Sequence, residues 1–271
     1  MRHNYIYHGD CADVLKKFPE DHFALAITSP PYANKRGGPK VNTYVDWFQP
    51  IAKELYRVLR DDGSFVLNIK ECVVKGERHT YVHDLIGMLR GMGWLWVEEY
   101  CWHKRNSFPG KWPNRFRDAF ERCHHFTKNK HFCMYQDEVR VPIGDWSKSR
   151  LKHLSATDRQ RDPSKVGSGF GKNVSNWVDR DTVFPTNVLH MATECGNKQH
   201  SSAFPLWLPE WFMRLFTKEG DTILDPFLGS GTSAVAAKCL KRKFVGIEVN
   251  KQHVETARER IRNDKGRKGA G

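Results

Sequence analysis

The sequence predicts an α/β fold, in which a mostly parallel β-sheet is covered by helices on both faces. Short apolar runs typical of buried strands alternate with segments whose apolar residues recur every three to four positions. This alternation occurs at both ends of the chain, and a glycine-rich turn joins a strand to a helix near the C-terminus. Such an alternation is typical of a parallel sheet whose crossovers are helices.

The first 135 residues supply strands and helices in turn. Apolar runs bounded by turn residues predict four strands, at Tyr5–His8, Phe23–Thr28, 64–69 and 95–102. Helical periodicity predicts a short helix from Cys11 to before Pro19 and longer helices at 45–59 and 81–92. We expect Asp61-Asp62-Gly63 to end the second helix, and the alternation at 121–135 around Asn129 suggests a hairpin.

Periodicity fades at 137–194, which is rich in Ser, Asp, Arg, Lys and Gly, and returns after it. The later elements are a helix near 207–216, a strand at 222–224, the glycine-rich turn with a helix to 240, a strand at 244–249 and a helix from 251. We therefore expect one main domain made of 1–136 and 195–263, a loop-rich insertion at 137–194 and a frayed basic tail at 264–271.

Composition restricts the class of protein. With 271 residues and 39% hydrophobic content the chain can bury one sizeable core. No apolar run approaches the roughly 18 residues that span a bilayer, and the N-terminus has no signal-peptide layout, so we expect a soluble, intracellular protein.

The cysteines predict reduced thiols rather than a disulfide or metal framework. There are seven, they are scattered, and none forms a Cys-x-x-Cys pair. One local cluster invites a metal interpretation, but it lacks paired ligand spacing, and an ordinary strand pair explains it better, so we expect no metal. Its members are Cys123, His124, His125, His131 and Cys133.

Positive charge is concentrated in two segments of the chain. The formal net charge is +13, of which residues 102–180 carry +9 (17 basic, 8 acidic) and residues 238–271 carry +7 (11 basic, 4 acidic). A polyanion lying across one face fits this pattern better than a merely solvated surface, because both segments also hold Trp, Asn and Arg.

The glycine-rich turn predicts a nucleotide-like ligand. A strand runs into Asp225-Pro226-Phe227-Leu228-Gly229-Ser230-Gly231-Thr232, and a second strand ends about twenty residues later in Glu248. The glycines permit close backbone approach at a helix N-terminus, and Glu248 is placed to accept from two ribose hydroxyls. No Walker lysine follows, and Asp225 would repel phosphate, so a cofactor with a cationic amino group, S-adenosylmethionine, fits better.

A second motif, Ser29-Pro30-Pro31-Tyr32, directly follows the apolar strand Phe23–Thr28. Two prolines stiffen the backbone and hold its carbonyl oxygens in fixed directions. We expect the Ser29 hydroxyl and the Pro30 carbonyl to accept the two N–H bonds of an exocyclic amino group, which frees the nitrogen lone pair to attack a methyl group. Tyr32 offers a flat face for a flipped base. We therefore predict Ser29, Pro30, Pro31 and Tyr32 as the catalytic centre.

In this order along the chain, the motifs resemble the DNA amino-methyltransferase family. Within it they are similar to the permuted beta group, in which the catalytic motif comes first and the cofactor turn last. The resemblance covers most of the chain outside 137–194. It includes three weaker segments: Gly9-Asp10-Cys11, Trp102-His103-Lys104-Arg105-Asn106 with Pro109, and His200-Ser201-Ser202-Ala203-Phe204-Pro205.

The resemblance implies a Rossmann-like methyltransferase fold, S-adenosyl-L-methionine as cofactor and double-stranded DNA as partner. In that family Gly9-Asp10-Cys11 corresponds to the adenine-contacting turn, Asp225 to the contact with the cofactor's amino group, and Thr232 with Ser201 or Ser202 to the contact with its carboxylate. The predicted cofactor-binding residues are Asp10, Cys11, Ser201, Ser202, Phe204, Asp225, Phe227, Gly229, Gly231, Thr232 and Glu248.

On the same basis residues 1–136 form the catalytic half of one domain, residues 195–263 its cofactor-binding half, and 137–194 the target-recognition region. Basic and polar side chains in that region can contact base edges and phosphates. The predicted DNA-binding residues are Trp102, Lys104, Asn106, Lys148, Arg150, Lys152, Arg159 and Arg161.

The resemblance also favours a target. A serine at the first catalytic position is similar to the cytosine-N4 enzymes of the family, whereas an aspartate is usual in the adenine-N6 enzymes. We therefore favour methylation of cytosine N4, with adenine N6 as the alternative. Cytosine-C5 transfer needs a cysteine nucleophile, usually after proline, and none of the thirteen prolines is followed by cysteine.

Two other classes stay open: a methyltransferase of RNA or of protein glutamine, and a catalytically silent nucleic-acid-binding module. Against the silent module stand the intact serine, prolines, tyrosine and cofactor glycines. We expect a cytoplasmic, nucleoid-associated enzyme without membrane contact. The sequence is compatible with a cognate restriction endonuclease that acts separately, and with either a monomer or a homodimer.

Overall fold

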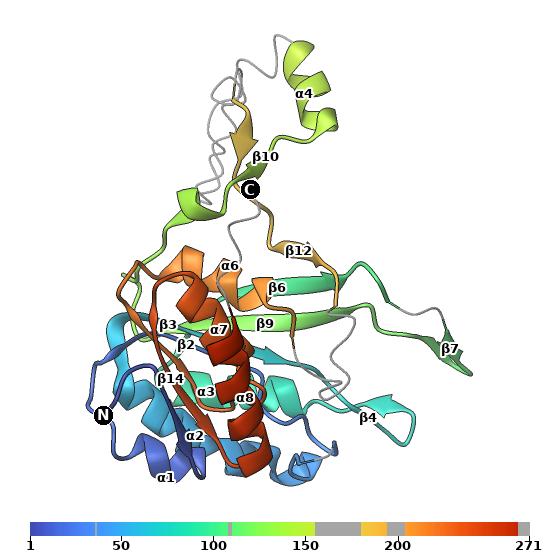
Figure 1. Ribbon diagram of the computed structural model, residues 1–271. Coiled ribbons are helices and arrows are strands. Elements are labelled where there is room, and N and C mark those ends of the chain that lie inside the picture. The colour runs from blue at the N-terminus through green and yellow to red at the C-terminus, as the bar shows by residue number, and fades with distance from the viewer. Residues whose placement is uncertain (36, 108–109, 155–179, 194–203, 265–271) are drawn as a thin grey trace. The chain divides into compact units, whose positions relative to one another are not determined.

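A single mixed sheet organises the larger part of the chain (Figure 1). The computed structural model describes residues 1–35, 37–107, 110–154, 180–193 and 204–264, apart from the side chains of residues 146, 147 and 150. Two compact units are present, one made of Met1–Tyr135 with Asn187–Gly271 and one made of Gln136–Thr186. The α/β fold predicted from the sequence is confirmed.

Eight strands form this sheet in the order β1-β14-β13-β2-β3-β9-β6-β12. All neighbours are parallel except β9, which runs antiparallel to both β3 and β6. The strands are β1 Tyr5–His8, β2 Phe23–Thr28, β3 Leu59–Ile69, β6 Leu95–Lys104, β9 Phe120–Thr127, β12 Val188–Met191, β13 Thr222–Asp225 and β14 Lys243–Glu248.

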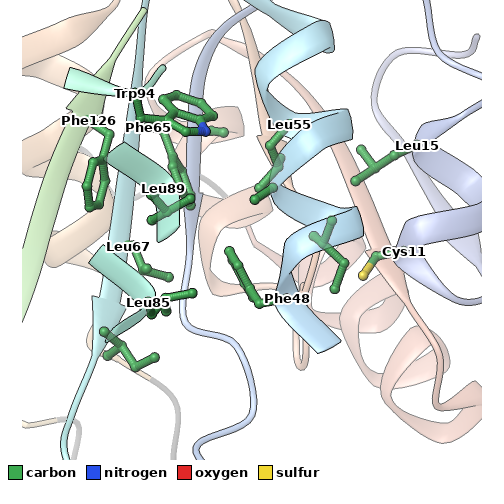
Figure 2. Close-up of a cluster of buried hydrophobic side chains, with 14 of the residues drawn as sticks. Cys11, Leu15, Phe48, Leu55, Phe65, Leu67, Leu85, Leu89, Trp94 and Phe126 are labelled. Carbon is green, nitrogen blue, oxygen red and sulfur yellow. The ribbon is translucent and has the colours of Figure 1, made fainter. Parts of the chain in front are cut away.

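Helices cover both faces of the sheet. One face carries α1 Cys11–Leu15, α2 Tyr44–Val58 and α3 Tyr81–Gly91, and the apolar sides of these helices pack on β3, β9 and β14. Figure 2 shows Phe48 and Leu55 of α2 and Leu85 and Leu89 of α3 in one cluster with Phe65 of β3, whose ring packs on Trp94 and Phe126. Helices α6 Trp207–Phe216, α7 Thr232–Cys239 and α8 Lys251–Asn263 complete the fold, with α6 against the opposite side of β9.

Shorter elements connect these parts. The larger unit also has the 3₁₀-helix η1 Val41–Thr43 and two small hairpins, β4 Val73–Val74 with β5 Glu77–Arg78 and β7 Lys111–Trp112 with β8 Arg115–Phe116. The smaller unit contains η2 Gln136–Val139, β10 Val141–Pro142 paired with β11 Thr182–Val183, and α4 Asp145–Lys152. Its range differs from the predicted insertion at 137–194, because Val188–Met191 pairs with β6 in the main sheet.

The hairpin predicted at 121–135 is wrong. Only Phe120–Thr127 is a strand, and β3 and β6 pair with it on its two sides. The chain after Thr127 is instead bound by polar contacts to the beginning of β3. Asn129 donates to the Asp61 carbonyl oxygen at 2.7 Å, and the Cys133 N–H donates to the Asp62 carbonyl oxygen at 2.9 Å.

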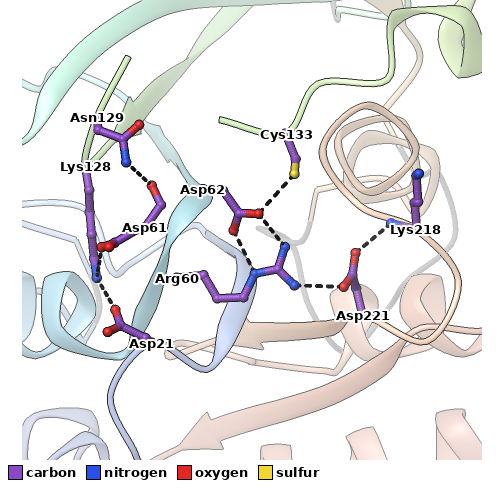
Figure 3. Close-up of polar contacts among 9 residues, drawn as sticks. All are labelled: Asp21, Arg60, Asp61, Asp62, Lys128, Asn129, Cys133, Lys218 and Asp221. Carbon is purple, nitrogen blue, oxygen red and sulfur yellow. Dashed lines mark hydrogen bonds and ion pairs between the residues drawn. The ribbon is translucent and has the colours of Figure 1, made fainter. Parts of the chain in front are cut away.

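The sequence Asp61-Asp62-Gly63 does not end a helix, as predicted, but lies inside β3, which begins at Leu59. Both acids have cationic partners (Figure 3). Lys128 lies 3.4 Å from Asp61, and Arg60 binds both Asp62, at 2.8 Å, and Asp221, at 3.0 Å. Since these ion pairs satisfy the carboxylates, the strand accommodates residues that rarely occur in strands.

The His/Cys cluster divides between the two faces of β9. The His124 ring packs at a tilt against Phe126 and Trp96, whereas His125 contacts Phe216 of α6 and lies 2.9 Å from Ser64 Oγ. Burial lowers the pKa of His125 to about 3 and that of His124 to about 4, so both rings are neutral core groups at pH 7. No group of three or more His, Cys, Asp or Glu side chains suited to a metal occurs among the described residues.

Within the described ranges, no helix combines the length and the apolar character needed to cross a membrane.

Candidate active site

The two sequence motifs meet at the carboxyl edge of the sheet. Strands β14, β13 and β2 are parallel neighbours, so Glu248, Asp225 and Thr28 end at the same edge. The Thr28 hydroxyl donates to Asp225 Oδ1 at 2.7 Å, although 197 positions separate the two residues. Ligands of open α/β sheets bind at this edge. The contact therefore joins Ser29-Pro30-Pro31-Tyr32 directly to the glycine-rich turn.

Asp225 is buried and has several protein donors. Besides Thr28, its carboxylate accepts from the Phe227 N–H at 3.0 Å and from the Ser233 hydroxyl at 2.5 Å. Burial raises its pKa to about 6, and the donors from Ser233, Thr28 and Phe227 partly oppose that rise. The carboxylate has about four acceptor positions, and these donors occupy three. Asp225 thus holds β2, β13 and α7 together, and one of its acceptor positions could take a further donor such as an ammonium group.

The turn at 229–232 is tightly packed against α8. Gly231 caps α7 with a φ of +86°, and a Cβ atom there would lie 2.8 Å from Ala257 Cβ. Arg260, which sequence reasoning missed, donates to the carbonyl and hydroxyl oxygens of Ser230 and to the Thr232 hydroxyl. Both contacts fix the backbone N–H groups at the α7 N-terminus in place.

Glu248 lies at the end of β14 with its side chain 10% exposed. Its Oε2 accepts from the Gly229 N–H at 2.8 Å, and its Oε1 accepts from the Asn250 N–H at 2.8 Å. Each carboxylate oxygen can accept a second hydrogen bond. The geometry therefore suits a vicinal diol, such as that of ribose, whose two hydroxyls would donate to the two oxygens.

The end of β1 lies beside this carboxylate. His8 pairs with Glu248, and the Gly9 N–H donates to the Glu248 carbonyl oxygen at 3.1 Å. Asp10 is exposed and caps α1 by accepting from the Ala12 N–H at 2.8 Å. Cys11 is buried, which raises the pKa of its thiol to about 12 and makes it an unreactive neutral group.

An aromatic group lies next to the turn. Phe227 is partly exposed and contacts Trp47 and Phe48 of α2, with ring centroids 5.6 and 6.4 Å apart. Phe204, another predicted cofactor residue, is 8% exposed and belongs to the core. The predicted cofactor residues Ser201 and Ser202 lie outside the described residues.

The backbone of the Pro-Pro segment is held by polar contacts. The Tyr44 hydroxyl donates to the Pro31 carbonyl oxygen at 3.0 Å, and the Lys35 N–H donates to the Tyr32 carbonyl oxygen at 3.1 Å. Over the described part of the chain no group donates to the Pro30 carbonyl oxygen. That oxygen is thus an acceptor on a backbone fixed from both sides.

The Tyr32 hydroxyl is the centre of a polar network. It lies 2.8 Å from Glu121 Oε2 and 3.2 Å from Asn68 Oδ1, and the Ser29 hydroxyl donates to it at 3.3 Å. Lys104 donates to the other Glu121 oxygen at 2.5 Å. Burial, with the Glu121 charge second, raises the pKa of Tyr32 well above its usual value, so it stays protonated. Because the Ser29 hydroxyl donates its hydrogen bond to Tyr32, the lone pairs of Ser29 Oγ stay available as acceptors.

Sequence reasoning missed Asn68 and Glu121. Asn68 could have been noticed as a polar residue near the end of a buried strand. Glu121 gave no comparable signal, since it lies in a strand that runs antiparallel to β3.

Three predicted DNA-binding residues have structural partners instead. Trp102 is 3% exposed, and its indole N–H donates to the Met191 carbonyl oxygen at 3.1 Å. Lys104 is paired with Glu121, and Asn106 accepts from the Thr193 N–H at 2.7 Å. These side chains join β6 to β9 and β12, and Trp102 is a buried core residue, whereas contact of the three with DNA stays a prediction.

The other predicted DNA contacts belong to the smaller unit. Lys148 and Lys152 are exposed on α4. The Arg150 side chain, Arg159 and Arg161 lie outside the described residues.

Known proteins are similar to this chain over most of its length. The model of a DNA methylase family, the N6/N4 methyltransferases, matches residues 23–259. The type II methyltransferase M.PvuII of Proteus hauseri is 29% identical over 274 residues, which cover 92% of this chain and 81% of the relative.

Solved structures are similar over nearly the whole chain. PvuII DNA methyltransferase (cytosine-N4-specific) has a TM-score of 0.71 and 25% identity, covering 96% of this chain and 86% of that chain. TTHA0409 of Thermus thermophilus, complexed with S-adenosyl-L-methionine, has a TM-score of 0.62 and 22% identity, covering 94% and 92%. The family match spans both motifs and the sheet that joins them, and the chain accordingly belongs to the N6/N4 family of DNA methyltransferases.

Proposed function

We propose that this chain transfers a methyl group from S-adenosyl-L-methionine to the exocyclic N4 of a flipped cytosine in duplex DNA. The observation that supports the proposal is the Thr28–Asp225 hydrogen bond, which joins the residue before Ser29 to the start of the glycine-rich turn. Methyl transfer requires the acceptor amino group and the methyl donor to be held in line at close range.

The turn fits the proposed cofactor. Glu248 has acceptor positions left for two ribose hydroxyls, and the backbone at the α7 N-terminus suits a carboxylate. Asp225 has one acceptor position left for an ammonium group. When bound, S-adenosyl-L-methionine supplies the methyl group. A solved structure of TTHA0409, which has the same fold, is a complex with this compound.

The catalytic residues would act as acceptors of hydrogen bonds. Ser29 Oγ and the Pro30 carbonyl oxygen would each accept one N–H of the amino group, which withdraws the nitrogen lone pair from the ring. The Tyr32 hydroxyl accepts the hydrogen bond of the Ser29 hydroxyl. The partly exposed Tyr32 ring would offer a face on which the base stacks. The surplus proton leaves to water without a strong base.

Two observations favour cytosine N4 over adenine N6. Serine stands at the first catalytic position, and the solved structure with a TM-score of 0.71 is described as cytosine-N4-specific. The two amino groups are similar in geometry, so adenine N6 is the alternative.

We further propose that the smaller unit, with neighbouring residues up to 194, recognises the target sequence through basic side chains such as Lys148 and Lys152. Relatives named type II methyltransferases support a role in restriction–modification.

The test is methyl transfer to duplex DNA with radiolabelled cofactor, followed by digestion and separation of the nucleosides. We expect N4-methylcytosine, and N6-methyladenine as sole product would overturn the base assignment. Ser29→Ala should slow transfer about one hundredfold while leaving cofactor affinity intact. Thr256→Ala, which removes an exposed hydroxyl on α8, is the matched control and should leave both unchanged. An equal loss of cofactor affinity in Ser29→Ala would mean that Ser29 acts on the cofactor instead.

A further inference from the structure

A small hairpin projects from the sheet between β6 and β9. Residues 110–117, here called the finger, consist of β7, β8, the two residues that join them, Pro113 and Asn114, and the flanking residues Gly110 and Arg117. Figure 1 shows β7 beyond the ends of β6 and β9. The two long strands pair as far as His103 and Phe120, and the Lys104 N–H donates to the Ala119 carbonyl oxygen at 2.7 Å.

The finger exposes two large aromatic side chains. Phe116 is 85% exposed and Trp112 is 55% exposed, the highest values among the large apolar residues of the described chain apart from Val249. Full exposure of an aromatic ring brings no gain in folding stability, because ring burial is what stabilises a fold. The two rings are therefore available to a partner.

Cations surround these rings. Arg115 lies over the Trp112 ring, with its guanidinium carbon 5.5 Å from the centroid, and Lys111 and Arg117 are exposed. The Arg117 side chain lies across Gly110, where a Cβ atom would be 2.9 Å from Arg117 Cδ. From residue 105 to residue 117 the sequence has four cationic residues and no acid. Positive charge interleaved with aromatic rings is suited to nucleic acid, since cations meet phosphates and rings meet base faces.

The base of the finger is anchored. Asp118 pairs with Lys70 at 3.0 Å and with Arg78 at 2.5 Å, which ties the finger to the end of β3 and to β5. The finger is also joined to the catalytic motif, since Lys104 and Glu121 flank it on β6 and β9 and Glu121 lies 2.8 Å from the Tyr32 hydroxyl. Strand β6 runs in the same direction as β2, so the finger leaves the sheet from the edge that carries Ser29.

We propose that the finger binds the DNA duplex at the methylation target, and that Trp112 and Phe116 enter the base stack beside the extruded base. Lys111, Arg115 and Arg117 contact the flanking phosphates. Apolar side chains inserted between base steps unstack them at a cost of a few kcal/mol, which lowers the further cost of extruding a neighbouring base. The inference rests on the proposed function, because it takes duplex DNA as the substrate.

The experiment uses the full chain and a duplex that carries its methylation site with 2-aminopurine next to the target base. Trp112→Ala with Phe116→Ala should raise the KM for DNA tenfold or more and reduce the 2-aminopurine fluorescence increase on binding. Cofactor affinity should stay unchanged, which also reports an intact fold. The matched control is Trp96→Ala, since Trp96 is 42% exposed at the other end of β6.

A second set of variants separates charge from stacking. Lys111→Ala with Arg117→Ala should weaken DNA binding at low salt and reduce the slope of log Kd against log salt by about two. If the aromatic variants bind and methylate DNA as the wild type does, the proposal is overturned, and the finger then serves a partner other than DNA. Failure of the proposed function looks different, because the wild-type chain would then bind cofactor and transfer no methyl group to any duplex.

Discussion

Tyr32 shows at the scale of one residue how a catalytic motif depends on residues far from it in sequence. Its aromatic ring was predicted to stack on a base, and its hydroxyl proves to have a second set of contacts with Ser29, Asn68 and Glu121. In the proposed mechanism these contacts would orient the ring and direct the hydrogen of the Ser29 hydroxyl away from the incoming amino group. Both effects should contribute to the rate of transfer rather than to cofactor binding.

We therefore expect Tyr32→Phe to lower the single-turnover rate of methyl transfer about tenfold with unchanged cofactor affinity, because the hydroxyl that accepts from Ser29 and contacts Asn68 and Glu121 is lost. Tyr32→Ala should cost more, since it also removes the stacking face. Tyr5→Phe, which changes a tyrosine at the start of β1, is the control. A wild-type rate in Tyr32→Phe would show that the hydroxyl has no part in positioning Ser29.

Asp225 links protonation to folding. Burial raises its pKa to about 6, whereas the unfolded chain titrates near 3.8. The folded protein thus binds this proton more tightly than the unfolded chain does. The resulting stabilisation is fully present below pH 3.8 and is lost as the pH rises through 6.

Asp225→Asn should abolish this dependence. We expect the free energy of unfolding of the wild type to fall relative to that of the variant by about 3 kcal/mol between about pH 3.5 and pH 7, since each pKa unit corresponds to about 1.4 kcal/mol. Urea denaturation at a series of pH values measures it, with Asp13→Asn on the surface of α1 as control. Parallel profiles for wild type and Asp225→Asn would contradict the assignment.

At the scale of elements, the turn between β13 and α7 owes its shape to its two glycines, which differ in their surroundings. Gly231 has a φ of +86° and no room for a Cβ atom, because Ala257 of α8 lies against it. Gly229 has a φ of +54°, and no heavy atom lies within 4 Å of the position of its Cβ. A substitution at Gly231 therefore meets both strain and a clash, and one at Gly229 meets only strain.

We predict that Gly231→Ala lowers the free energy of unfolding by about 3 kcal/mol and weakens cofactor binding, since α7 must move away from α8. Gly229→Asn, the matched variant, should cost about 1 kcal/mol because asparagine tolerates a positive φ. Thermal unfolding and calorimetric titration with S-adenosyl-L-methionine measure the two effects. Equal losses in the two variants would show that the Ala257 contact is unimportant.

Helices and strands were predicted correctly where the residue pattern of the segment itself shows which face is buried. The prediction failed where a strand pairs with strands far from it in the sequence. Strands such as Phe23–Thr28 are apolar along their whole length, and α2 shows its buried face in its periodicity. The alternation at 121–135 around Asn129 suggested a hairpin, but β9 pairs with β3 and β6, which precede it by about sixty and twenty-five residues. Alternation reports which residues face a core and does not identify the partner strand.

At the scale of the whole molecule, the charge distribution predicts how DNA binding responds to salt. Lys148 and Lys152 are exposed on α4, in the segment that carries +9 of the net charge. Each phosphate contact contributes about 0.9 to the slope of log Kd against log salt. If both lysines contact phosphates, the double alanine variant should reduce that slope by about two.

Fluorescence anisotropy of a labelled duplex between 50 and 200 mM salt, roughly the range over which such contacts are resolved, measures this slope. The control removes Lys16 and Lys241, which are equally exposed but pair with Asp13 and Glu219 at 3.0 and 2.9 Å. An unchanged slope in the α4 variant, or an equal change in the control, would show that the smaller unit does not contact the phosphates.

The sequence by itself determined the α/β class, the two motifs and the kind of reaction. These properties depend on short stretches such as Ser29-Pro30-Pro31-Tyr32, in which the residue types define the local chemistry. It also indicated a basic protein suited to nucleic acid, because net charge is counted from the sequence alone.

Only the tertiary structure decided how the site is assembled. It brought Thr28 to Asp225 across 197 positions, placed Glu121 on the Tyr32 hydroxyl and buried Trp102 among its neighbours. It also showed that the finger, which no motif had marked, is exposed at the edge of the sheet that carries Ser29. The physical reason is that hydrogen-bond partners and exposure are set by strand order and register, and residue spacing along a chain does not encode either of them.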